Sequence, residues 1–155
     1  MGPGTRRSRL KPSCPRSRLR TLSLLLDTHY VYALAGAPGR LSDQEAAFLA
    51  APPAPLLVSA VSIWEMRLKW QALHASGARK GPISPAQVVT ILATQPVTFL
   101  PLLASHAVVT LSPALAHHDP FDELLLAQAQ MERHQLLTRD AKLLLHPLAR
   151  QATCG

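Results

Sequence analysis

The chain has 155 residues, of which 48% are hydrophobic and 16% charged, so it is long enough for one domain with a core and too apolar for a disordered protein. Its formal net charge is +7, but the excess is local: residues 1–21 hold seven basic residues and no acid, whereas residues 22–155 hold nine of each. The rest of the chain has no net charge, which excludes a folded body that binds nucleic acid through overall charge alone.

The first half of the chain contains alternating strand and helix signals. The elements expected there, in order, are a strand at 22–26, helices at 28–35 and 43–50, a strand at 56–58 and a helix at 60–73. Ser42 followed by Glu45 is a capping box for the second helix, and Ser59 or Ser62 could cap the third. A turn at 36–39, rich in glycine and proline, separates the first two helices.

The second half continues the alternation. The expected elements are a helix starting at Ser84 and Pro85, a strand at 97–100, a helix at 102–111, a helix starting at Pro120, a strand at 135–137 and a short helix after Asp140. Short apolar strands that alternate with helices predict an α/β, three-layer sandwich with a mostly parallel central sheet flanked by helices.

The two ends differ in composition from this body. Residues 1–20 are rich in Pro, Arg and Ser, so we expect a disordered basic extension or a start site assigned too early, with non-specific phosphate binding as the functional alternative. We expect one domain at 21–148 and a poorly structured tail at 149–155. Cys14 and Cys154 form no metal or disulfide pattern, and no run reaches membrane-spanning length. These features favour a cytoplasmic protein without a membrane partner.

Two acids lie at or just beyond the ends of mostly apolar runs. Asp27 ends the run at 22–26, and Asp140 follows the run at 136–138. Because the carboxyl ends of parallel strands open onto a crevice, both side chains are expected there. Gathered carboxylates repel, so at least one pKa rises unless a cation neutralises them. Hard oxygen ligands of this kind suit Mg²⁺ or Mn²⁺.

Each acid also has an ordinary structural interpretation. Asp119 before a proline is a good N-cap, and Asp122 lies in a first helical turn, where the helix dipole favours negative charge. Asp140 could likewise be an N-cap. Glu65 borders the expected buried face of its helix and could form an i,i+4 pair with Lys69. The joint occurrence of these acids at element ends or edges favours a site.

Four sequence blocks in this order resemble PIN domains, and most closely the VapC-type toxins of bacterial toxin–antitoxin systems. The blocks are Leu-Leu-Leu-Asp-Thr-His at 24–29, Val-Ser-Ala-Val-Ser-Ile-Trp-Glu-Met at 58–66, His-Asp-Pro-Phe-Asp-Glu-Leu-Leu-Leu-Ala-Gln-Ala at 118–129 and Leu-Thr-Arg-Asp at 137–140. The resemblance covers about residues 22–145. The third block is specific, and the others gain weight from their order and spacing.

The resemblance implies a catalytic quartet. Asp27 matches the family's first acid, Glu65 the helix acid, Asp122 the third acid and Asp140 the fourth. Thr138 matches a hydroxyl residue often found near the metal. Asp119 matches a common but less central position. Of the quartet, Asp27, Asp122 and Asp140 are the implied metal ligands for Mg²⁺ or Mn²⁺.

The implied function is a metal-dependent endoribonuclease that acts as the toxin of a toxin–antitoxin pair, with RNA as substrate and a small antitoxin as partner. A catalytically inactive PIN-fold protein that binds RNA or a partner is the alternative. A phosphatase or receiver domain is disfavoured, because Thr28 and His29 follow Asp27 where those proteins carry a second acid. Two departures from the family are Glu123, where a basic residue is usual, and a poor closing strand after His146.

Surface residues suggest further interactions. We expect a homodimer formed by apolar helix faces around Phe48, Leu49 and residues 64–70, with Trp64 itself in the core. Candidate phosphate contacts are Arg67, Lys69, Arg79, Lys80, Arg139 and Lys142. A transition-metal site at His29, His117 and His118 is less favoured than exposed loop histidines, because adjacent histidines rarely converge on one metal.

Overall fold

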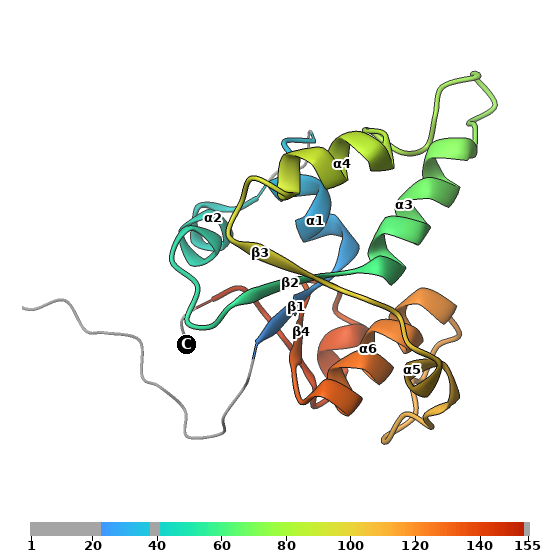
Figure 1. Ribbon diagram of the computed structural model, residues 1–155. Coiled ribbons are helices and arrows are strands. Elements are labelled where there is room, and N and C mark those ends of the chain that lie inside the picture. Colours follow the sequence, from blue (N-terminus) through green and yellow to red (C-terminus); the bar gives the residue numbers. More distant parts are fainter. Residues whose placement is uncertain (1–22, 38–40, 154–155) are drawn as a thin grey trace, which may run out of the picture.

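A computed structural model describes residues 23–37 and 41–153 (Figure 1). The expected basic extension at 1–20, both cysteines and part of the turn at 36–39 lie outside the described residues. None of the helices in the described part of the chain is long and apolar enough to cross a membrane.

A five-stranded sheet forms the centre, and every neighbouring pair of its strands is parallel. The strands are β1 (Leu24–Leu26), β2 (Leu56–Ser59), β3 (Val97–Leu100), β4 (Gln135–Leu137) and β5 (Ala149–Arg150). Their order is β3-β2-β1-β4-β5. Strands β2 and β3 are thus added on one side of β1, and β4 and β5 on the other side. This reversal between β1 and β4 is the place where open parallel sheets bind ligands.

Helices cover both faces of the sheet. They are α1 (Thr28–Leu34), α2 (Asp43–Ala50), α3 (Ala60–Gln71), α4 (Pro85–Leu92), α5 (Ala104–Val108), α6 (Pro120–Glu132) and the 3₁₀ turn η1 (Leu143–Leu145). Figure 1 shows α1, α2 and α4 on one side of the sheet and α5 and α6 on the other. The predicted three-layer α/β sandwich is therefore confirmed.

The strand side chains divide between two cores. Leu24 and Leu26 pack into the core beneath α1 and α2, whereas Leu25 packs against α6 in the other. All three are fully buried. A strand covered on both faces has no need for polar alternation, which explains its uninterrupted leucine run.

Most of the helices and helix caps predicted from the sequence are present in the structure. Ser42 and Glu45 form the expected capping box of α2, and Ser59 caps α3 through a hydrogen bond from Val61 N–H. The expected helix at 102–111 is shorter, because α5 covers only five residues and is preceded by Pro101. The short helix after Asp140 is a 3₁₀ turn, and Asp140 Oδ1 accepts hydrogen bonds from Lys142 N–H and Leu143 N–H.

The C-terminal segment is more ordered than the sequence indicates. The expected tail at 149–155 contributes β5, and Ala152 is buried. Thr138 N–H donates to Arg150 O at 2.9 Å, so β5 satisfies backbone groups on the open side of β4. A pairing of two residues is too short to leave an apolar pattern in the sequence.

The expectation that Trp64 of α3 lies in the core was wrong. Trp64 is 50% exposed and Leu68 39% exposed, whereas Val61, Ser62 and Met66 are buried. The helix packs against α1, α4 and α6, so the residues that face these neighbours are the buried ones. Phe48 and Leu49, expected on an interaction surface, lie in the core instead.

Candidate active site

Asp27 lies where β1 ends beside β4. Its backbone N–H donates to Leu137 O at 3.0 Å, which continues the strand pairing up to the acid. Its side chain is nearly buried, and Oδ2 accepts a hydrogen bond of 2.6 Å from the fully buried Thr138 hydroxyl. The same hydroxyl accepts a hydrogen bond of 3.0 Å from Asp140 N–H. Thr138 therefore links the first and fourth predicted acids.

The amino end of α6 carries three acids, of which Asp119 and Asp122 were predicted to belong to the site. Asp119 Oδ1 accepts hydrogen bonds from Phe121 N–H at 2.9 Å and Asp122 N–H at 3.2 Å, so it is the expected N-cap. Asp122 is not used in this way. Its Oδ2 lies 3.0 Å from His117 Nε2.

Glu65 comes from α3 and its side chain is 16% exposed. Thr28 Oγ1 donates to Glu65 Oε2 at 2.5 Å, and Lys69 Nζ lies 2.5 Å from Oε1. The Glu65–Lys69 pair considered from the sequence is thus present. Glu65 also contacts Thr28, the residue after Asp27.

All of these acids border one hollow of about 390 Å³. Its lining consists of Asp27, Thr28, His29, Glu65, Lys69, Asp119, Asp122, Arg139 and Asp140. The structure therefore brings together the four predicted catalytic acids and Asp119. Thr138 is not part of the lining and lies beneath it, in contact with Asp27.

The surroundings shift two carboxyl pKa values in opposite directions. Burial acts to raise the pKa of Asp27, but hydrogen bonding and charge from His29, together with the Thr138 hydroxyl, outweigh burial and hold it below its ordinary value. Burial raises the pKa of Asp122 above its ordinary value. His117 opposes this rise, whereas the charges of Asp119 and Asp27 add to it. Asp119 and Asp27 are therefore close enough to Asp122 to repel its negative charge.

A divalent cation fits this set of donors chemically. Among the described residues, no three acid, histidine or cysteine side chains are already arranged around a common metal position. The carboxylates instead accept hydrogen bonds from neighbouring side chains, as Asp27 does from Thr138 and Glu65 from Thr28. Yet several carboxylates share one hollow and repel, which is the environment that Mg²⁺ or Mn²⁺ stabilises. Rotation of these side chains is needed to point their oxygens at one ion.

Two histidines have contacts that the sequence interpretation missed. His29 Nδ1 lies 3.2 Å from Asp27 Oδ2, and His117 holds Asp122. Both side chains are only about a quarter exposed, at 25% and 23%. The position of His29, two residues after an acid that ends a strand, was a signal that could have found the first contact. The sequence of the loop before α6 contains no comparable pattern that would have predicted the contact of His117 with Asp122.

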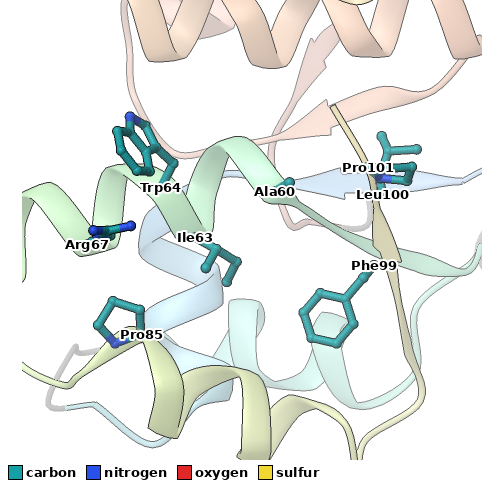
Figure 2. A pocket seen from close by; sticks show the side chains of 8 residues that line it. All are labelled: Ala60, Ile63, Trp64, Arg67, Pro85, Phe99, Leu100 and Pro101. Carbon is teal, nitrogen blue, oxygen red and sulfur yellow. The ribbon is translucent and has the colours of Figure 1, made fainter. Parts of the chain in front are cut away.

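A second hollow of about 420 Å³ lies elsewhere and contains none of these acids. It is lined by Ala60, Ile63, Trp64, Arg67, Pro85, Phe99, Leu100 and Pro101. Figure 2 shows Ile63 and Phe99 pointing into the space between α3, α4 and β3. Its lining is apolar except for Arg67, so it is suited to binding apolar groups and not to hydrolytic chemistry.

Comparisons with known proteins agree with this arrangement. The model of the PIN domain family matches residues 24–146, more than half of the chain and a range that includes all four acids. A search of curated proteins gives no significant match. Among solved structures, one similar chain is from the crystal structure of VapBC2 from Rickettsia felis bound to a DNA fragment from their promoter. The TM-score is 0.55 at 16% identity, covering 83% of this chain and 97% of that chain, which supports the fold.

The buried hydroxyl of Thr138 gives a testable pH dependence. A carboxyl whose pKa is lowered in the folded state contributes stability above its unfolded pKa, and this contribution is lost as the pH falls through the folded-state pKa. Thr138→Val removes the hydrogen bond to Asp27, so we expect a loss of roughly 1.5–3 kcal/mol of unfolding free energy at pH 7. The loss should shrink toward pH 3. Urea unfolding at several pH values measures it.

Thr138→Ser is the matched control, because it keeps the hydroxyl and should retain most of the wild-type pH dependence. A Val variant whose deficit is the same at every pH would show that the hydroxyl does not act through the charge of Asp27.

Proposed function

Because the chain belongs to the PIN domain family, we propose that it is a metal-dependent endoribonuclease that cleaves RNA phosphodiester bonds. The observation that carries this proposal is the meeting of Asp27, Glu65, Asp122 and Asp140 at one hollow. The hollow lies at the carboxyl ends of β1 and β4, where the strand order reverses. The domain would span residues 21–148, with β5 added at its C-terminal edge.

The residues of this chain have distinct roles in the proposal. Asp27, Asp122 and Asp140 would hold the metal, and Glu65 would add a fourth carboxylate at the edge of the site. Thr138 fixes the carboxylate of Asp27 through their 2.6 Å hydrogen bond. Asp119 keeps the first turn of α6 in place by capping it. When bound, Mg²⁺ or Mn²⁺ would supply an activated water for attack on the phosphorus atom and stabilise negative charge on the phosphate.

Removal of single carboxylates tests the chemistry. Asp27→Asn and Asp122→Asn should each lower the rate of single-stranded RNA cleavage in Mg²⁺ by at least about 100-fold, the scale on which one lost electrostatic contact to a transition state acts. Both variants should stay folded, because each change preserves the size of the side chain. Gel analysis of labelled RNA measures cleavage, and circular dichroism checks folding.

Asp43→Asn is the control for these variants, since it makes the same change at an exposed position of α2 outside the hollow. It should cleave RNA like the wild type. Equal cleavage by all four proteins would identify a contaminating nuclease. A folded wild type that binds metal without cleaving any RNA would favour the inactive, RNA- or partner-binding alternative.

We further propose that the protein acts as the toxin of a toxin–antitoxin pair. The similar solved structure is that of VapBC2 bound to promoter DNA, and the fold shared with it supports a similar assembly for this chain. The proposed antitoxin segment places a basic side chain among the carboxylates, where it would neutralise them and take the position of the metal.

The apolar hollow of Figure 2 is the surface we assign to a homodimer. It borders Trp64, which is 50% exposed, and β3, one of the two edge strands of the described sheet. Exposed apolar side chains beside an uncovered strand edge favour association. This surface replaces the one expected at Phe48 and Leu49, which are buried.

Co-expression with the product of a neighbouring small gene tests both associations. We expect a complex without nuclease activity and, for the chain alone, the mass of a dimer. Trp64→Glu should give a monomer, whereas Val108→Glu, at a position 80% exposed that does not line the hollow, should remain dimeric. Light scattering measures the masses. An active wild-type monomer that binds no such product would refute the toxin assignment and leave the nuclease assignment standing.

A further inference from the structure

The side chains that line the proposed active site carry an excess of negative charge. Its lining includes five carboxylates and two cationic side chains, Lys69 and Arg139. With all of these ionised, three negative charges are in excess, and one divalent metal leaves one. RNA phosphates are also negative, so a substrate is attracted only if positive groups are directed at it.

Lys69 is one of these two cations. Its side chain is 47% exposed, and Glu65 takes one of the three donors of its ammonium group. An i,i+4 pair on a helix contributes only about 0.3–0.5 kcal/mol to stability, so the fold has little need of it. A half-exposed ammonium on a flexible stem can contact Glu65 and a bound phosphate in turn.

Arg139 is the other cation, and it lies between Thr138 and Asp140 in sequence. Its guanidinium is 3.8 Å from Glu45 Oε2 and lies over the Tyr30 ring, with its central carbon 5.9 Å from the ring centroid. Glu45 is itself fixed by a 2.7 Å hydrogen bond from the Tyr30 hydroxyl. The guanidinium is thus supported from outside the hollow, and its planar fork of donors suits a phosphate.

The two cations come from segments that follow the strands on either side of β1, the strand that ends at Asp27. Strand β1 lies between β2 and β4. Helix α3, which carries Lys69, leaves from the end of β2, whereas Arg139 follows the end of β4. The remaining cations that the sequence suggested as phosphate contacts, namely Arg67, Arg79, Lys80 and Lys142, do not line the hollow.

We propose that Lys69 and Arg139 bind the sugar–phosphate backbone of RNA on the two sides of the scissile phosphate. This inference rests on the proposed nuclease function. It gives a substrate-binding role to two residues that would otherwise be regarded as ordinary surface charges. Affinity for RNA would then depend on phosphate contacts and not on the identity of the bases.

The test measures binding of a fluorescent single-stranded RNA in Mg²⁺ as a function of salt, in an Asp122→Asn background that does not cleave it. Each neutralised phosphate contact contributes about 0.7 to the slope of log K against log salt for single strands. Lys69→Gln and Arg139→Gln should therefore each reduce the slope by about 0.7, equally for RNAs of different sequence. Lys69→Arg should retain the slope.

Lys80→Gln is the matched control, because it removes the same charge at an exposed position outside the hollow, and it should keep the parent slope. In the otherwise wild-type enzyme, Lys69→Gln should raise KM more than it lowers kcat. Thermal melts separate this effect from loss of folding.

Different results would overturn the phosphate-binding role and the nuclease function. Slopes for Lys69→Gln and Arg139→Gln that equal the slope for Lys80→Gln, in an enzyme that cleaves RNA, would overturn the phosphate-binding role alone. A folded wild type that neither binds nor cleaves RNA in Mg²⁺ would overturn the nuclease function and this inference with it.

Discussion

The parallel pairing of β1 with β4 is the constraint on which the candidate site depends. It brings the ends of two strands distant in sequence to one edge of the sheet, and the bond from Asp27 N–H to Leu137 O extends the pairing as far as the acid. Thr138 then contacts both Asp27 and Asp140 through one buried hydroxyl. The crossover before β4 ends in α6, whose first turn adds Asp122 to the same hollow.

Such a gathering of carboxylates destabilises the fold unless their charges are compensated. Three of the five acids have a nearby partner: Asp27 lies beside His29, Asp122 beside His117, and Glu65 is paired with Lys69. The compensation is uneven, because the pKa of Asp27 is lowered while burial and neighbouring acids raise that of Asp122. Asp122 is therefore the carboxylate with most to gain from a cation that binds several of the acids together.

The sequence correctly predicted those features of the fold that depend on residues close together in the chain. The leucine run before Asp27 indicated a buried strand, and Ser42 with Glu45 indicated a capped helix start, because both patterns reflect local physics. The exposed position of Trp64 depends on which helices pack against α3, and β5 depends on the open side of β4, so neither was predictable locally. The acids could be selected from the sequence because each ends or borders an element. The pair of Glu65 with Lys69 was also expected from its i,i+4 spacing, whereas the contacts of His29 and His117 became apparent only in three dimensions.

If these carboxylates form a divalent-metal site, the melting temperature of the protein depends on added metal. A ligand that binds the folded state stabilises it by mass action, so millimolar Mn²⁺ or Mg²⁺ should raise the melting temperature of the wild type and have little effect on Asp122→Asn. Without metal, Asp122→Asn should melt no lower than the wild type, because it relieves repulsion among the acids. A wild type whose melting temperature is unchanged by millimolar metal would show that the acids do not form a metal site.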